Sequence, residues 1–330
     1  MYEIERETDA VQRDNKSSVE MSVVIPTHNK AEDVERCVSG VLSMPFNYGR
    51  FEVVVVDDGS REPIEERLRK FDCGDVALRV VRLEGSGPAA ARNAGIREAK
   101  GDIVAFCDDD AIPQDGYLDA IYEPFTTSSE VVGVEGAVIP IDGEEFGLLG
   151  MSPKNDCGGV YLTCNIAFRR DILVRVGGLD QAFPFPAFED CDLAAACEEH
   201  GTIIWQPAAI VHHPRRCWSL WRAVREIKFY EPLVLFARRY GYLGWPDRPT
   251  KYPALRVYWS AVVALPAGRI LSGLKALVGS RKITTLRFIG ISLAQAVVAS
   301  VASLGPIRKG LKADVTRRNW LTQDGISSVN

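Results

Sequence analysis

From residue 21, the sequence alternates short apolar runs with helix-like segments, and this alternation constrains the fold more than any other feature. The apolar runs are rich in Val and Ile and lie at 21–26, 51–56, 77–83 and 103–107, with helix-like segments at 30–42, 63–71 and 88–99 between them. Short β-branched runs separated by helices are typical of a parallel sheet whose two faces are both covered. The expected fold class is therefore α/β, with a doubly wound, mostly parallel sheet.

Polar residues follow each apolar run, at the edge where a doubly wound sheet binds its ligands. These residues are Thr27 after the first run, Asp57 and Asp58 after the second, Gly87 and Arg92 at the third helix, and Asp108, Asp109 and Asp110 after the fourth. Two acidic clusters at one edge repel each other unless a cation lies between them. Few oxygen ligands, completed by substrate phosphates, suit Mg²⁺ or Mn²⁺.

These motifs also have simpler interpretations. An Asp-Asp-Gly-Ser sequence after a strand is common in ordinary turns. The Gly85–Gly87 segment lacks the third glycine of a dinucleotide-binding fingerprint, because Ala90 stands there, and it also lacks the Gly-Lys-Ser/Thr of a phosphate loop. A nicotinamide-dependent oxidoreductase is therefore disfavoured. Three consecutive aspartates after a strand exceed what a turn requires and favour a functional site.

Two further motifs lie in the second half of the chain. Glu189, Asp190 and Asp192 stand at the start of a predicted helix over 191–200. Helix capping favours acids at this position, but the apolar approach over 184–188 also suits the desolvation of a general base. Two adjacent histidines, His212 and His213, end another strand-like run, and either a structural or a ligand role is consistent with them.

Taken together and in this order, the motifs resemble those of family-2 glycosyltransferases with the GT-A fold. The similarity runs through VVIPTHNK (23–30), VVVVDDGS (53–60), GSGPAAARNAGIREAKGD (85–102), IVAFCDDDAIP (103–113), CNIAFRRDILVRVGGLD (164–180), FEDCDLAAACEEHG (188–201) and IVHHP (210–214). It covers about three-fifths of the chain. The resemblance implies an inverting transferase that uses a nucleotide-sugar donor and a divalent metal ion.

The resemblance also implies a role for each site residue. The donor would be bound by Thr27, Asp57, Asp58, Gly87, Arg92, Asp108 and Asp109; the metal, Mn²⁺ or Mg²⁺, by Asp110 and His212; and the acceptor by Asn165 and Glu189. Asp190 would be the base that takes the proton of the acceptor hydroxyl as its oxygen attacks the anomeric carbon. A single displacement of this kind inverts the anomeric configuration.

Processive members of this family carry a Gln-x-x-Arg-Trp motif after the Glu-Asp pair. In this chain, residues 216–218 read Arg-Cys-Trp and match only superficially. We therefore expect a non-processive enzyme that adds one sugar. The alternatives are a nucleotidyltransferase of related fold, whose glycine- and lysine-rich loop the N-terminal motif lacks, and a catalytically inactive membrane-bound scaffold, which would have no need for the clustered carboxylates.

Charge divides the chain into a flexible leader (1–20), a catalytic domain (21–247) and a basic helical tail (248–330). The tail holds 13 basic and 2 acidic residues, while residues 1–247 carry a net charge of −16. Basic helices around the uncharged run 288–307 are expected to lie on an anionic membrane surface. The acidic catalytic part argues against nucleic acid as a partner. Eight cysteines without a Cys-x-x-Cys pair, and no signal peptide, predict a cytoplasmic protein at the inner face of the membrane.

Overall fold

The computed structural model describes residues 19–71, 73–141, 150, 151, 153–214, 216, 217, 230–240, 309, 312–314 and 316–321. Its main feature is an eight-stranded sheet with the strand order β3-β2-β1-β4-β8-β6-β9-β5. A second, two-stranded sheet pairs β7 (Gly150–Met151) with β10 (Arg216–Cys217). The expected leader over 1–20 and most of the expected tail, including the run 288–307, lie outside the described residues.

One half of the large sheet is parallel. It contains β3 (Ala77–Leu83), β2 (Phe51–Asp58), β1 (Met21–Thr27) and β4 (Ile103–Phe106). The first, second and fourth of the predicted apolar runs become strands that are buried on both faces, as their continuous hydrophobicity requires. Because these strands are parallel, their carboxyl ends meet at one edge of the sheet.

The other half of the sheet is mixed. β8 (Ile166–Arg169) is antiparallel to both β4 and β6 (Val131–Pro140), β6 is parallel to β9 (Thr202–His213), and the short β5 (Ile112–Pro113) is antiparallel to β9. Four of the seven pairings are therefore parallel. The α/β, doubly wound class is confirmed, and the sheet is mixed where the second half joins the first.

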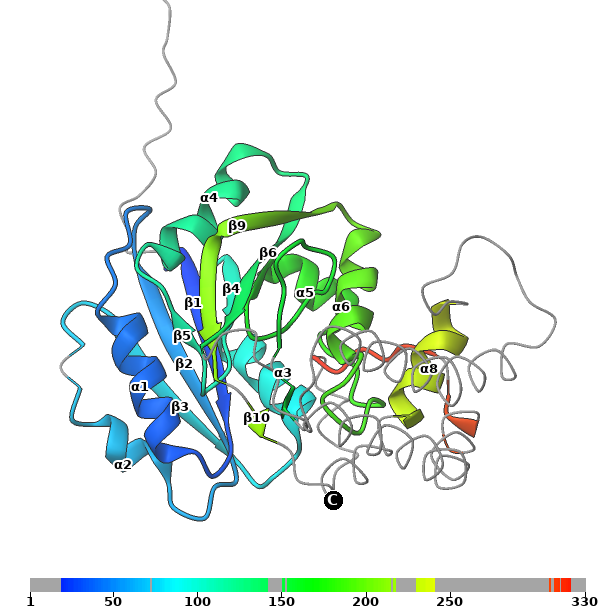
Figure 1. Ribbon diagram of the computed structural model, residues 1–330, viewed down its shortest axis with the longest axis horizontal. Helices are drawn as coiled ribbons and strands as arrows, with labels where there is room; N and C mark the ends of the chain where they lie inside the picture. Colours follow the sequence, from blue (N-terminus) through cyan, green and yellow to red (C-terminus); the bar gives the residue numbers. More distant parts are fainter. Residues whose placement is uncertain are drawn as a thin grey trace, which may run out of the picture.

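Helices cover both faces of the sheet (Figure 1). On one face lie α1 (Ala31–Leu42), α2 (Ile64–Leu68) and α4 (Tyr117–Thr127), which share a core with alternate residues of β1, β2 and β4. On the other face lie α3 (Pro88–Glu98), α5 (Arg170–Val176) and α6 (Glu189–Glu198). The alternation of side chains along each strand divides the apolar residues between these two cores.

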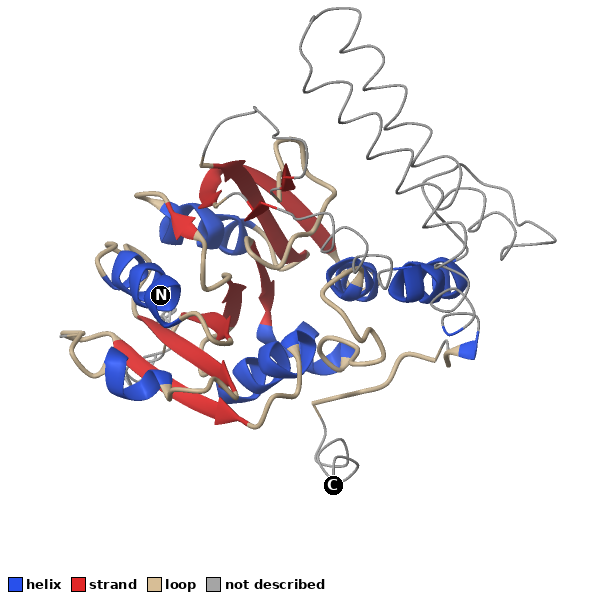
Figure 2. Cartoon of the chain, turned by 60° about the horizontal axis from the view of Figure 1, so that its bottom comes forward, coloured by secondary structure: helices blue, strands red, loops and turns tan. Residues whose placement is uncertain are grey.

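One more helix, α8 (Tyr230–Tyr240), lies beside α6, and the segment 316–321 returns from the end of the chain to the same region (Figures 1 and 2). No helix among the described residues is both long enough and apolar enough to cross a membrane.

Candidate active site at the carboxyl edge of the sheet

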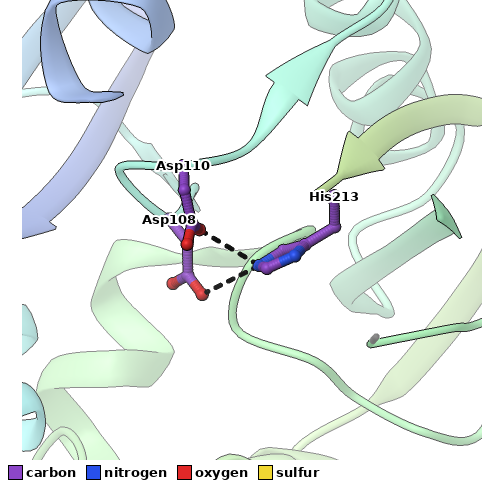
Figure 3. Close-up of side chains that lie close together, drawn as sticks. All are labelled: Asp108, Asp110 and His213. Carbon is purple, nitrogen blue, oxygen red and sulfur yellow. Dashed lines mark ion pairs between the residues drawn. The ribbon is translucent and has the colours of Figure 1, made fainter. Parts of the chain in front are cut away.

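Two aspartates and a histidine meet at the carboxyl edge of the sheet. Asp108 and Asp110 lie in the loop after β4, and His213 is the last residue of β9 (Figure 3). The Nε2 atom of His213 lies 3.1 Å from Asp110 Oδ1 and 3.9 Å from Asp108 Oδ2. One ligand atom of each residue lies within 4.8 Å of the others. Two carboxylate oxygens and an imidazole nitrogen at this spacing can hold a divalent metal ion.

The negative charges of Asp108 and Asp110 are compensated by neighbouring cationic groups. Burial lowers the pKa of His213, but contacts with Asp108 and Asp110 outweigh it and raise that pKa to about 9. Burial raises the pKa of both Asp108 and Asp110. His213 and Arg92 nevertheless bring the pKa of Asp108 down to about 2, and His213 and Lys30 lower the pKa of Asp110. A metal ion would take the place of the imidazolium proton, because only a neutral imidazole binds a metal.

The structure corrects the histidine chosen from the sequence. We expected His212 near the metal, but His213 is the residue that faces Asp108 and Asp110. Successive side chains of a strand point to opposite faces of the sheet. His212 therefore points away from the cluster, in register with Ile112 of β5 and Ile139 of β6.

Lys30, which the sequence analysis did not select, belongs to the same site. Its Nζ atom lies 2.8 Å from Asp109 Oδ1 and 2.7 Å from Asp110 Oδ2. Asp109 also accepts a hydrogen bond of 2.9 Å from the Thr27 hydroxyl. Lys30 follows the first strand by three residues, at the edge where the sheet binds its ligands. That position was the signal available in the sequence.

Arg92 connects this cluster to α6. Its guanidinium is buried, and Nη2 donates a hydrogen bond of 2.8 Å to Asp108 Oδ1. Nη1 lies 3.8 Å from Glu189 Oε1 in the first turn of α6. Burial lowers the pKa of Arg92, but Asp108, Glu189 and Asp190 together outweigh it and raise that pKa. Arg92 is thus charged and lies among the carboxyl groups of these three residues.

Glu189 and Asp190 have different surroundings although they are adjacent. Glu189 is 3% exposed, and burial together with Asp190 raises its pKa to about 8. Asp190 is partly exposed, and its Oδ1 accepts a 2.8 Å hydrogen bond from the Cys191 N–H. Burial raises the pKa of Asp190 as well. Asp190 is therefore the more accessible of the two carboxyl groups, whereas the burial of Glu189 against Arg92 contradicts its expected contact with an acceptor.

Asp57, Asp58 and Gly87 join two loops at the same edge. Asp57 accepts a hydrogen bond from the Ser60 N–H and pairs with Arg82. Asp58 accepts hydrogen bonds of 2.7 and 2.8 Å from the N–H groups of Ser86 and Gly87. Gly87 has a φ of +93°, in the region that glycine adopts most readily. Both carboxylates therefore hold the loops that begin at the ends of β2 and β3.

Asn165 is buried inside the sheet and does not face an acceptor. Its amide nitrogen donates hydrogen bonds of 2.8 Å to the carbonyl groups of Ala137 and Ala209. The side chain is also packed against Gly136, where an added Cβ would lie 2.5 Å from Asn165 Nδ2. This geometry contradicts the expected acceptor contact, since the amide crosses between β6 and β9 instead.

Comparison with known proteins identifies the part of the chain that carries Arg92, Asp108 and Asp110. Residues 22–173 match the family described as "Glycosyl transferase family 2". These residues form a family-2 glycosyltransferase domain. The chain is 31% identical to the glycosyltransferase AglE of Haloferax volcanii over 175 residues, which are 50% of this chain and 56% of that protein. It is 29% identical to the pre-mycofactocin glycosyltransferase of Mycobacterium tuberculosis over 217 residues, 60% of this chain and 43% of that protein.

The chain thus spans about half the length of the curated relatives it matches. Among solved structures, it resembles a mannosyltransferase of Pyrobaculum calidifontis in complex with GDP-Man and Mn²⁺, with a TM-score of 0.55, 21% identity and 87% of each chain covered. It also resembles residues 1–349 of S. aureus TarS, with a TM-score of 0.55, 17% identity, and 90% and 88% covered. Both likenesses confirm that the glycosyltransferase domain has the GT-A fold.

Proposed function

We propose that this protein is a metal-dependent glycosyltransferase that moves one sugar from a nucleotide-diphosphate sugar to a hydroxyl group of an acceptor. The observation that carries the proposal is the cluster of Asp108, Asp110 and His213 at the carboxyl edge of a family-2 domain, joined through Arg92 to the carboxylates of α6. Oxygen and nitrogen ligands at the carboxyl edge of the sheet, with a carboxylate base beside them on α6, are what this transfer requires.

The metal would be Mn²⁺ or Mg²⁺, held by Asp108, Asp110 and His213. When bound, it supplies positive charge that neutralises the diphosphate leaving group. Lys30 is half-exposed at the same edge and can contact a phosphate when it leaves Asp110. The Mn²⁺ named in the Pyrobaculum complex supports this choice of ion.

The donor would bind along the loops that Thr27, Asp57, Asp58 and Gly87 shape, with Asp109 and Arg92 beside it. In this proposal Asp57 and Asp58 act on the donor through the loop backbone that they hold, because their oxygens already accept backbone N–H groups. Neighbouring structures contain GDP-Man and UDP-GlcNAc. These two donors are therefore the first to test.

Asp190 would take the proton of the acceptor hydroxyl as its oxygen attacks the anomeric carbon, which inverts the configuration in a single displacement. Partial exposure and a pKa raised by burial both suit this role. Glu189 and Arg92 would keep the base in place from the buried side, since one neighbours it in the chain and the other lies among the same carboxylates.

The acceptor would be a growing cell-surface glycan or a lipid-linked sugar, reached from the cytoplasmic face of a membrane. A relative in Haloferax volcanii, 28% identical over 180 residues, is named a glucosyl-dolichyl phosphate glucuronosyltransferase, which supports a lipid-linked acceptor. The basic composition of residues 248–330 supports contact with anionic lipid. Sedimentation with anionic liposomes tests this part, and an absence of binding at low salt would contradict it.

A thermal-shift screen of UDP, GDP and other nucleoside diphosphates, with and without Mn²⁺, tests the proposed activity first. A ligand that binds only the folded state raises its stability with concentration, so the correct nucleotide should raise the melting temperature only when Mn²⁺ is present. The matching nucleotide sugar is then incubated with the enzyme and Mn²⁺. Release of free sugar measures slow turnover in which water is the acceptor. If no nucleotide shifts the melting temperature in the presence of Mn²⁺, the proposal is wrong.

A further inference from the structure

Two aspartates outside the active site are fully buried. Asp180 lies after α5, and Asp192 lies in the first turn of α6, only two residues after Asp190; both are 0% exposed. A buried carboxylate is costly unless cations and hydrogen bonds compensate its charge. The groups that compensate both aspartates come from α8 and from residues near the end of the chain.

Asp192 is surrounded by three donors. Arg239 Nη1 lies 2.5 Å from Asp192 Oδ1, and the Tyr240 hydroxyl donates a hydrogen bond of 2.9 Å to the same oxygen. Arg317 Nε donates a hydrogen bond of 3.0 Å to Asp192 Oδ2. Residues of α8 bind one oxygen of this carboxylate, and Arg317 of the segment 316–321 binds the other. We call the segment 316–321 the C-terminal strap.

Asp180 shares these partners. Arg239 Nη2 donates a hydrogen bond of 2.8 Å to Asp180 Oδ2, so that one guanidinium bridges both aspartates. The indole Nε1 of Trp320 donates a hydrogen bond of 2.8 Å to Asp180 Oδ1. The C-terminal strap thus contributes one cation, Arg317, and one neutral donor, Trp320, to a network built around Arg239.

The backbone of the strap is also fixed against the domain. Trp320 N–H donates a hydrogen bond of 2.9 Å to the Gly177 carbonyl, and Arg317 donates to the carbonyl groups of Val176 and Gly178. The fit is close, since a Cβ added to Gly177 would lie 2.5 Å from Asn319 Cα. In Figure 1 the strap, drawn in red, runs between α8 and the ends of α3 and α6. These contacts make the strap part of the folded domain.

The position of Asp192 on α6 gives the network a consequence for the active site. Residues two positions apart lie on different sides of a helix. The network holds the Asp192 side of the first turn, while Asp190 on the other side remains partly exposed. A change in the network would therefore rotate or loosen the turn that carries the proposed base.

We propose that Arg239, Arg317 and Trp320 are positioning residues, which fix the first turn of α6 by binding Asp180 and Asp192 and so hold Asp190 toward the acceptor. The proposal rests on the function proposed above, because it assigns the base to Asp190. It gives the C-terminal strap a role in turnover and no role in donor binding, since the metal cluster is carried by β4 and β9.

Arg317→Gln tests the proposal, and Arg318→Gln is its matched control. Arg318 is the next residue, its side chain is 62% exposed, and its ion pair with Asp314 spans 3.6 Å at the surface. Three measurements are made on the full chain. They are hydrogen–deuterium exchange of the peptide covering 188–198, affinity and stoichiometry for UDP or GDP with Mn²⁺ by calorimetry, and release of sugar from UDP-GlcNAc or GDP-Man.

In Arg317→Gln we expect faster exchange in the first turn of α6, turnover lowered about tenfold or more, and donor affinity within about twofold of wild type, because small misplacement of a reacting group is costly. Arg317→Lys keeps the charge and should recover part of the turnover. Arg318→Gln should match wild type in all three measurements. An unchanged stoichiometry of nucleotide binding shows that the variant is folded. A loss of turnover then reflects the position of Asp190.

Trp320→Phe provides a second variant if Arg317→Gln does not fold, because it keeps an aromatic ring and removes only the donor to Asp180. Unchanged exchange in α6, or an equal loss of donor affinity and turnover, would overturn the positioning role while leaving the proposed function intact. If wild type binds nucleotide with Mn²⁺ but releases no sugar from any donor, the proposed function fails, and the positioning of a base fails with it.

Discussion

Glu189 and Asp190 are adjacent in the sequence but differ in their exposure to solvent. The buried Glu189 lies against Arg92, and the partly exposed Asp190 accepts a local hydrogen bond from the Cys191 N–H. A general base needs access to the hydroxyl proton and a pKa raised toward the working pH. Burial raises the pKa of both residues, so exposure is the condition that favours Asp190, in agreement with the family resemblance.

We predict that Asp190→Asn lowers turnover by roughly 10²–10⁴-fold, the usual loss for a general base, and leaves the affinity for nucleotide with Mn²⁺ nearly unchanged. The amide keeps the shape of the side chain but cannot accept a proton. Sugar release and calorimetry on the same preparation measure both quantities. A loss of this size in Glu189→Gln, with none in Asp190→Asn, would move the base by one residue.

Glu189 should also make stability depend on pH. Burial and Asp190 raise its pKa from 4.5 to about 8, so the folded protein holds a proton that the unfolded chain releases. The stabilisation by this proton is fully present below about pH 4.5 and is lost as the pH rises through about 8. Glu189→Gln cannot ionise, and its stability relative to wild type should therefore increase over this range, by up to a few kcal/mol.

Urea unfolding of wild type and Glu189→Gln between pH 5 and 9 measures this difference. Glu199→Gln is the control, since Glu199 is exposed at the other end of the same helix. A difference in unfolding free energy between Glu189→Gln and wild type that stays constant across pH would mean that Glu189 is ionised in the folded protein throughout.

At the scale of elements, strand alternation decides which histidine belongs to the site. The sequence shows two adjacent histidines at a strand end, and choosing between them requires the register of β9 against β6 and β5, which depends on long-range pairing. The strands and helices of the first hundred residues were predicted to within a few residues because their hydrophobic periods are clear. The helix α4, over Tyr117–Thr127, was missed.

We predict that His213→Ala raises the Mn²⁺ concentration needed for nucleotide binding about tenfold or more, whereas His212→Ala changes it little. The first variant removes one of three ligand groups, and the second removes a side chain on the opposite face of the sheet. Calorimetric titration of nucleotide at a series of Mn²⁺ concentrations compares the two. An equal effect of both variants would argue against the ligand role of His213.

The packing of α3 on β1 offers a test of the fold. A Cβ at Gly95 would overlap the Cγ1 methyl of Val24, whereas a Cβ at Gly40 in α1 would meet nothing within 4 Å. We predict that Gly95→Ala destabilises the protein by about 1–3 kcal/mol through overpacking. Gly40→Ala should stabilise it by about 0.5–1 kcal/mol, because alanine favours the helix. Thermal or urea unfolding of the two variants should therefore shift in opposite directions.

At the scale of the whole molecule, the sequence predicted the α/β class and the edge of the sheet that carries the site, but not the path of the chain after residue 214. A boundary near residue 247 was inferred from a change in composition, and it remains a prediction. The described residues show contacts that cross it, since Arg317 and Trp320 bind Asp192 and Asp180. Composition cannot reveal such contacts, because each depends on a single side chain meeting a carboxylate more than a hundred residues away.

These crossing contacts make the predicted catalytic domain incomplete by itself. We predict that a chain ending at residue 308 is less stable than the full chain by at least about 3 kcal/mol, the usual cost of removing one partner from a buried ion pair. A chain ending at residue 321 keeps every strap contact and is the matched control, which should unfold at the same urea concentration as the full chain. Equal stability of the two truncated chains would mean that Arg239 and Tyr240 compensate both aspartates without the strap, and that the strap binds a domain already able to hold α6 in place.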